Sequence, residues 1–133
     1  MPVLQMRLVV EAPDYEEAVH FYRDVLGLPE ELAVAGPDGA LVTILDAGRA
    51  TLELANPAQK RYIDEVEVGR QVAPRLRVAF EVADAADSAE RLADAGAALL
   101  AGPRETPWNS LNARLDAPAG LQLTLFQELV PGG

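Results

Sequence analysis

The sequence predicts an α+β fold in which two tandem βαβββ modules form one concave mixed sheet. An internal repeat is the first observation, because residues 4–27 and 74–96 follow one pattern at an offset of 70. Each copy begins with alternating hydrophobic residues, continues with an Asp-capped helical segment and ends at a glycine, which is typical of a strand followed by a helix. The aligned positions are Arg7 with Arg77, Leu8 with Val78, Glu11 with Glu81, Asp14 with Asp84, and, at an offset of 71, 52–54 with 123–125.

Composition limits the classes of function. The chain of 133 residues fits a single domain, residues 1–133, and with 50% hydrophobic residues it is not expected to be disordered. A net charge of −10 repels nucleic acid and anionic lipid and favours neutral or cationic ligands. The chain has no cysteine, and no apolar stretch reaches the roughly 18 residues of a membrane span. We expect a soluble, cytoplasmic protein with no nucleic-acid and no membrane partner.

Module one is expected to span residues 4–55. Alternation in its first strand places Arg7 and Val9 on the face opposite the hydrophobic core, and the same parity in its last strand places Glu53 there too. Arg7 and Glu53 are therefore expected to share one face of the sheet. The expected elements are strands at 4–11, 41–45 and 50–55 and a helix from Asp14 to Gly27 with inner residues Ala18, Phe21, Tyr22, Val25 and Leu26.

Residues 56–75 are expected to be a long connecting loop between the modules, of the kind that often contributes to a binding site.

Module two is then expected to span residues 76–127. Two sheets set edge to edge, each covered on one side by its helix, leave an open concave side, where ligand sites are common. The expected elements are strands at 76–82 and 98–100, a helix from Asp84 to Gly96 with inner residues Ala85, Ala89, Leu92 and Ala95, a loop at 102–109, and a hairpin of 111–115 with 121–127.

The chain resembles the vicinal oxygen chelate superfamily, which includes glyoxalase I, extradiol dioxygenases and bleomycin-resistance proteins. Four segments carry the resemblance: AVHFYRDVLGL, ATLELANP, RVAFEVADAADSAERLADAG and DAPAGLQLTLFQ. It extends over residues 4–127 and implies the glyoxalase/bleomycin-resistance fold. It also implies a homodimer, since relatives complete their clefts across a two-fold interface. The superfamily includes unrelated reactions and pure binders, so the fold alone does not name an activity.

Metal-dependent members of the superfamily hold their metal at four positions, and the residues at these positions predict no metal and no cofactor here. Of the four, only Glu53 could ligate. The single histidine, His20, rules out a site of two histidines and one carboxylate within one chain. Glu11, Glu53 and Glu81 could hold a hard cation, but two arginines among them would oppose it. By resemblance, the four positions fall on Arg7, Glu53, Arg77 and Thr124.

The substituted positions are expected to contact a ligand or, alternatively, to form a polar plug between the modules in which Glu53 pairs with Arg7 and Arg77. By resemblance, the aromatic residues near the cleft are expected to offer a stacking surface. For Trp108, ordinary packing in the core or in a dimer is the alternative. The candidate ligand-binding residues are Arg7, Val9, Glu53, Tyr62, Arg77, Trp108, Asn109, Asn112, Thr124 and Phe126.

Three functions remain open. The first is a metal-independent binding protein that sequesters an aromatic or cationic natural product, as bleomycin-resistance-like relatives do. The second is a lyase, isomerase or hydrolase of the same fold with Glu53 as general base and the arginines as an anion clamp. The third is an interaction module without a small ligand. The sequence favours binding over catalysis, because a single carboxylate is the only catalytic candidate.

Overall fold

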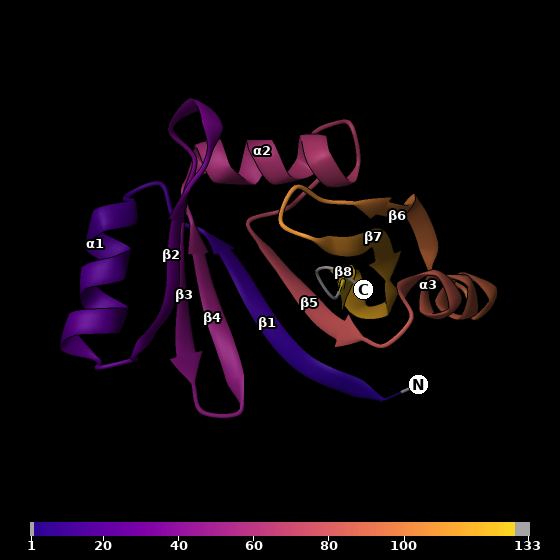
Figure 1. Ribbon diagram of the computed structural model, residues 1–133, viewed down its shortest axis with the longest axis horizontal. Coiled ribbons are helices and arrows are strands. Elements are labelled where there is room, and N and C mark those ends of the chain that lie inside the picture. The colour runs from indigo at the N-terminus through magenta and orange to yellow at the C-terminus, as the bar shows by residue number, and fades with distance from the viewer. Residues whose placement is uncertain (1, 130–133) are drawn as a thin grey trace.

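The computed structural model describes residues 2–129, which form one eight-stranded sheet in the order β2-β3-β4-β1-β5-β8-β7-β6 (Figure 1). The ends of the expected domain, residue 1 and residues 130–133, lie outside the described residues. The elements are β1 (Val3–Glu11), α1 (Tyr15–Val19), η1 (His20–Val25), β2 (Glu30–Ala35), η2 (Pro37–Gly39), β3 (Leu41–Ala47), β4 (Ala50–Ala55), α2 (Pro57–Glu67), β5 (Leu76–Val82), α3 (Ala85–Asp94), β6 (Ala98–Glu105), β7 (Ser110–Ala117), η3 (Pro118–Gly120) and β8 (Leu121–Glu128).

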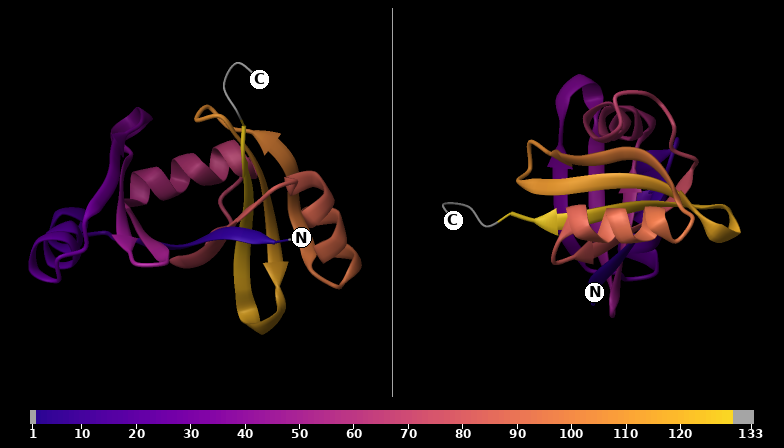
Figure 2. Two further views of the ribbon diagram at one scale, coloured as in Figure 1. Left: turned by 60° about the horizontal axis from the view of Figure 1, so that its bottom comes forward. Right: turned by 90° about the vertical axis from the view of Figure 1, so that its right-hand side faces the viewer.

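The two modules are joined at the centre of the sheet. Strand β1 pairs in parallel with β4 and antiparallel with β5, and β5 pairs in parallel with β8. Figure 2 shows that the strands of the two modules run in different directions, so that the sheet is strongly curved. These pairings confirm the expected α+β fold with two βαβββ modules and a mixed sheet.

Helix α1 covers the outer face of module one, but the helix expected from Asp14 to Gly27 is not a single α-helix. Asp14 caps α1 by accepting a hydrogen bond from the backbone N–H of Glu17, and Val19 is buried against Leu45 and Leu54. The chain then forms a π-helical turn, η1, whose wider i→i+5 hydrogen bonds change the helical spacing of the side chains, so that Tyr22 still packs against the core. Of the expected inner residues, the ones turned out to solvent are Phe21, Val25 and Leu26.

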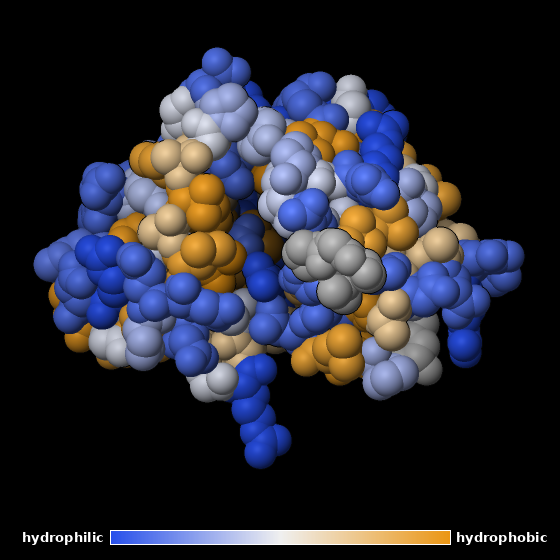
Figure 3. Space-filling view, in the orientation of Figure 1, coloured by the Kyte–Doolittle hydropathy of each residue, from blue (hydrophilic) through white to orange (hydrophobic). Residues whose placement is uncertain are grey.

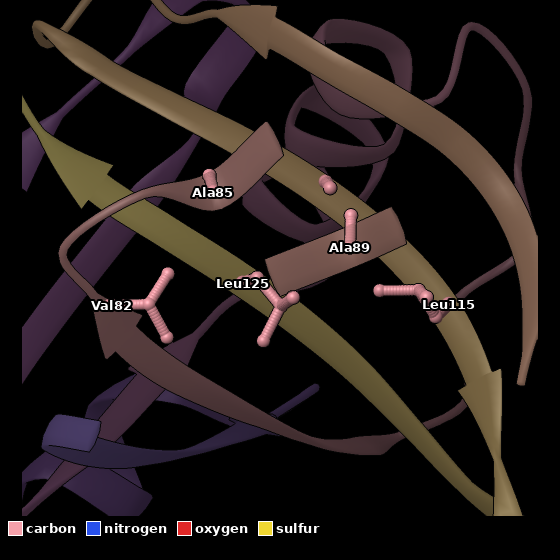
Figure 4. Close-up of a cluster of buried hydrophobic side chains, with 6 residues drawn as sticks. Val82, Ala85, Ala89, Leu115 and Leu125 are labelled. Atoms are coloured by element: carbon pink, nitrogen blue, oxygen red, sulfur yellow. The ribbon is translucent and has the colours of Figure 1, made fainter. Parts of the chain in front are cut away.

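Helix α3 packs on the outer face of module two (Figure 4). Ala85 and Ala89 are buried against Leu115 and Leu125, and their small side chains allow the helix to approach the sheet closely. Asp84 caps the helix as expected, by accepting from the backbone N–H of Asp87. Ala95 was expected on the inner face and is exposed, because the helix ends at Asp94.

The prediction of a connecting loop at 56–75 was wrong, since Pro57–Glu67 forms helix α2. Asn56 caps this helix by accepting a hydrogen bond from the N–H of Gln59, and Pro57 suits its first turn. The buried face of α2 consists largely of polar residues, which hides the hydrophobic periodicity that would announce a helix. In Figure 1, α2 bridges module one and module two, and it packs against β3, β4 and β7.

Two further elements differ from expectation in extent. Strand β2 has six exposed residues at one edge of the sheet, so it shows no buried pattern in the sequence. Strand β6 continues to Glu105 and includes part of the loop expected at 102–109. The hairpin of β7 with β8 is confirmed by its register, in which Leu115 lies opposite Leu123. Among the described residues, the helices are all too short or too polar to cross a membrane.

Candidate functional site

A cavity of about 530 Å³ lies between the two modules and beside α2. Its hydrophobic wall in module one includes Leu32, Val34 and Ile44 from β2 and β3. Figure 3 shows the hollow, with hydrophobic residues gathered on the module-one side. A volume of this size lies within the roughly 300–1,000 Å³ of typical small-molecule sites.

Aromatic side chains border the cavity from three separate elements. Tyr62 belongs to α2, Trp108 follows β6 and Phe126 belongs to β8. The rings of Tyr62 and Trp108 lie 6.2 Å apart, between centroids, and are tilted by 59°. Trp108 is 42% exposed, so it is not ordinary core packing within the monomer. The arrangement leaves ring surface available to a guest.

Strand register places the polar side chains at the base of the cavity. Val9 of β1 lies between Glu53 of β4 and Arg77 of β5, so these two polar side chains flank it on one face of the sheet. Two residues before Val9 on β1, Arg7 pairs with Ala79 of β5, and Ala79 pairs in turn with Thr124 of β8. The four positions that hold the metal in relatives therefore converge, as the alternation in the sequence predicts.

Arg7 and Glu53 form a loose ion pair, with 3.7 Å between Arg7 Nη1 and Glu53 Oε1. The Nε of Arg7 donates to the side-chain oxygen of Gln5 at 2.6 Å. Its guanidinium lies 5.0 Å from the centre of the Phe126 ring, within the range of a cation–π contact. Arg7 is thus held over the aromatic floor of the cavity with part of its hydrogen-bonding capacity free.

Burial raises the pKa of the Glu53 carboxyl above its ordinary value. The charges of Arg77 and Arg7 oppose this rise without cancelling it, and the nearby Glu67 carboxylate adds to it. The side chain is 14% exposed, so it can exchange protons with solvent or with a guest. Glu53 is therefore easier to protonate than a surface glutamate.

Arg77 is buried, and burial lowers the pKa of its guanidinium. The carboxylate of Glu67 counteracts that lowering, whereas the positive charge of Arg114 adds to it. Nη1 of Arg77 donates to the hydroxyl of Thr124 at 2.9 Å. The other N–H groups of Arg77 make no hydrogen bond to the part of the chain that the structure describes, residues 2–129.

A buried network beneath the cavity was missed by the sequence reasoning. Arg114 of β7 is fully buried and donates to Asp64 at 2.8 Å, to Glu67 at 2.7 Å and to Gln122 at 2.9 Å. Glu67 also accepts from the side-chain amide of Asn112 at 2.8 Å. The alternation of side chains along β7 and β8 was the signal that could have revealed this network. It places Asn112 and Arg114, and also Gln122 and Thr124, on one face of the sheet.

Asp64 shows how this network compensates for its buried charges. Burial alone would raise the pKa of Asp64, but the backbone N–H of Ala73, the guanidinium of Arg114 and the backbone N–H of Val72 more than offset it. The pKa of Asp64 is therefore lowered, and the carboxylate stays charged. Both backbone groups donate to its Oδ2 at 2.8 Å.

All but one of the candidate ligand-binding residues line the cavity. Asn109 is the exception, because it is an exposed turn residue in the left-handed region, with a φ of 63°. Whether the remaining residues bind a ligand stays a prediction. The lining candidates are Arg7, Val9, Glu53, Tyr62, Arg77, Trp108, Asn112, Thr124 and Phe126.

The residues at the superfamily's metal position do not fit a divalent ion. Arg7 and Arg77 bring positive charge to the place of two ligands, and the hydroxyl of Thr124 already accepts from Arg77. Residues 2–129 hold no group of three or more histidine, aspartate and glutamate side chains placed to bind a metal, so Glu11, Glu53 and Glu81 do not form the cation site considered above.

A model of the glyoxalase-like domain family matches residues 7–126 of the sequence. The chain belongs to this family. The match runs from Arg7, at the base of the cavity, to Phe126, at its aromatic floor, and so takes in both modules. It confirms the resemblance found in the four sequence segments. A search of curated proteins found no significant match to the glyoxalase-like chain.

Solved structures share the glyoxalase-like fold over nearly the whole chain. A hypothetical protein from Bacillus halodurans has a TM-score of 0.71 at 14% identity, over 98% of this chain and 96% of that one. Methylmalonyl-CoA epimerase from Mycobacterium tuberculosis has a TM-score of 0.65 at 20% identity, over 96% and 88%. A glyoxalase/bleomycin resistance protein/dioxygenase superfamily member from Vibrio splendidus has a TM-score of 0.63 at 13% identity, over 96% and 100%. At these identities the likeness shows the fold and not an activity.

Proposed function

We propose that this glyoxalase-like protein binds an apolar, ring-containing small molecule in the cavity between its modules and sequesters it without a metal and without turnover. A natural product such as an antibiotic is the proposed guest. The observation that carries the proposal is the combination of a preformed cavity of about 530 Å³ with three aromatic side chains at its border. Bleomycin-resistance-like members of the superfamily offer the precedent.

The residues at the base of the cavity support binding over metal-assisted chemistry. Where metal-dependent relatives hold ligands, this chain has two guanidinium groups, a hydroxyl and a single carboxylate. Guanidinium groups donate hydrogen bonds and cannot coordinate a metal. The net charge of −10 favours a cationic guest. A guest without positive charge is nevertheless the better candidate, because the positively charged Arg7 and Arg77 line the cavity.

Incubation of the purified protein with a panel of aromatic and glycopeptide antibiotics tests the proposal. Mass spectrometry should recover each bound compound unmodified, and calorimetry should show one molecule bound per cavity. A guest that binds only the folded state also raises the melting temperature. Conversion of a compound would refute sequestration, and a full panel without thermal stabilisation would favour an interaction module instead.

A lyase, isomerase or hydrolase is the second candidate, and the raised pKa of Glu53 favours it. A carboxylate with a raised pKa is a better general base near neutral pH, and Glu53 lines the cavity within reach of a guest. Turnover that disappears in Glu53→Gln while binding persists would establish this function. Metal analysis of the purified protein belongs to the same experiment, since stoichiometric metal beside Glu53 would overturn our assignment of the four positions.

We also propose that the protein acts in the cytoplasm as a homodimer, as the sequence and the family resemblance suggested. An uncovered hydrophobic strip on the outer face of β1 and β5, between α1 and α3, supports a second copy as partner. Sedimentation at micromolar concentration should give twice the mass of the chain, and Leu8→Glu should shift it to the monomer. The exposed residues of this strip are Leu4, Met6, Leu8 and Leu76.

A further inference from the structure

We propose that the cavity recognises a single negative charge on its guest, so that the guest is an apolar, ring-containing monoanion such as an aromatic carboxylate. This specificity deepens the proposed binding function and rests on it, because it concerns the chemistry of the molecule that the cavity holds. It follows from how unequally the three arginines at and below the base of the cavity are paired.

Arg114 has no capacity for a guest. Its Nε and Nη2 donate to Glu67, and its Nη1 donates to Asp64 and Gln122. Its side chain is fully buried, and its charge is already matched by two carboxylates. Glu67 in turn accepts from Asn112, so that its carboxylate is also satisfied.

Arg77 is in the opposite situation. It is 8% exposed and lines the cavity, yet its only hydrogen bond to residues 2–129 is the one from Nη1 to Thr124. Because Arg77 lines the cavity, its free N–H groups can donate to a guest. The planar fork of these donors matches a carboxylate in geometry and charge.

Arg7 offers a second set of donors on the same face of the sheet. Its Nε donates to Gln5, whereas the one contact that Nη1 makes with a carboxylate of residues 2–129 is with Glu53 at 3.7 Å, which is longer than a hydrogen bond. Among residues 2–129, neither Arg7 nor Arg77 has a carboxylate within hydrogen-bonding distance. A carboxylate brought by the guest could accept from both guanidinium groups.

The acidic surface limits the guest to one charge. The protein carries a net charge of −10, and Glu128 lies on the cavity lining, so polyphosphates and other polyanions are repelled. A single carboxylate is favoured all the same, because contacts at the base act over about 3 Å, whereas surface charges are screened within about 8 Å at physiological salt. The hydrophobic and aromatic walls then hold the body of the guest.

Three naphthalene probes of equal size test the inference by calorimetry near neutral pH: naphthoate, naphthamide and naphthylmethylamine. We expect naphthoate to bind about 10- to 100-fold more tightly than naphthamide, because a hydrogen bond to a charged group is the stronger kind. Arg77→Met should reduce the affinity for naphthoate to that for naphthamide and leave naphthamide itself unchanged. Arg49→Met, in an exposed turn away from the cavity, is the matched control and should change neither.

Two further variants keep the test decisive if Arg77→Met does not fold. Arg7→Met should weaken naphthoate selectively, and Glu53→Gln should strengthen it, because that change removes the competing carboxylate. Equal binding of the three probes, or preference for the amine, would overturn recognition of a negative charge and leave the proposed binding function in place. If none of the three bound, both proposals would fail.

Discussion

Glu67 of α2 and Arg114 of β7 form an ion pair with 2.7 Å between Oε1 and Nη2, and their side chains are 2% and 0% exposed. A helix that follows the last strand of module one is thereby fastened to a strand of module two. Tyr62 and Ile63, which precede Glu67 on the same helix, are held on the cavity wall as a result. The buried pair therefore has a part in shaping the cavity.

Arg114→Met should lower the free energy of unfolding by about 3–5 kcal/mol, because Asp64 and Glu67 would remain buried without their counter-charge. Urea unfolding followed by circular dichroism measures the change. Arg49→Met, at an exposed position, is the control and should stay within about 0.5 kcal/mol of the original protein. A loss below about 1 kcal/mol for Arg114→Met would contradict the importance of the pair.

Asn56→Ala should destabilise the protein by about 1–2 kcal/mol, as loss of a helix N-cap does. The Asn56 side chain accepts from the backbone N–H of Gln59 at 2.8 Å and donates to the carbonyl of Gly39 at 2.8 Å, which ties α2 to the β2–β3 connection. Asn56→Asp keeps the acceptor and loses the donor, so its melting temperature should lie between those of the original protein and Asn56→Ala. Equal stability of Asn56→Ala and the unchanged protein would show that the cap is dispensable.

The free energy of unfolding of the original protein, measured relative to that of the Glu53→Gln variant, should fall as the pH rises. The pKa of Glu53 is raised by burial, so between the ordinary glutamate value, about 4.3, and that raised pKa the folded state binds more protons than the unfolded state. The contribution of such a group to the free energy of unfolding therefore decreases as the pH increases through that window. The lowered pKa of Asp64 gives the opposite slope, but it is present in both proteins and cancels.

Urea unfolding of both proteins at a series of pH values measures this difference. The free energy of unfolding of the original protein, minus that of Glu53→Gln, should decrease from acid to neutral pH. A difference that is constant or that increases would mean that Arg7 and Arg77 outweigh the burial of Glu53.

Trp108 should report on occupancy of the cavity. It is 42% exposed, so a guest that stacks on it excludes water and should shift its emission to shorter wavelength or quench it. Trp108→Ala should weaken binding of naphthoate about tenfold. Phe21→Ala, at an exposed ring that is not part of the cavity lining, should leave the affinity unchanged. An unchanged spectrum at saturation would remove Trp108 from the proposed site.

The repeat and the strand alternation were sufficient to predict most of the fold. The alternation around Val9 placed Arg7, Glu53 and Arg77 on one face, because side chains of a strand alternate strictly between the two faces of its sheet. Helix α2 escaped prediction for a physical reason. Its inward positions Asp64 and Glu67 are charged, and they are buried only because Arg114, about 50 residues away in sequence, completes their ion pairs.

Part of the candidate site was predictable and part was not. Tyr62 and Trp108 were expected near the cleft by resemblance, and both line the cavity. The edge strand β2 was not located, although Leu32 and Val34 form much of one wall, because a strand with exposed residues on both faces has no buried alternation to recognise. Asn109 lies outside the cavity lining, in a turn whose backbone is hydrogen-bonded to Thr106 and Leu129.

The direct pairing of β1 with β5 joins the two halves of the molecule by a continuous backbone ladder from Gln5 to Val10. The separation between the two walls of the cavity therefore depends on the strand pairing at this junction. A thicker guest should displace the rim of the cavity, where the edge strand β2 and the turn around Trp108 lie outside the central pairing of β4, β1, β5 and β8. The strand pairing at the junction is thus expected to select guests by their thickness.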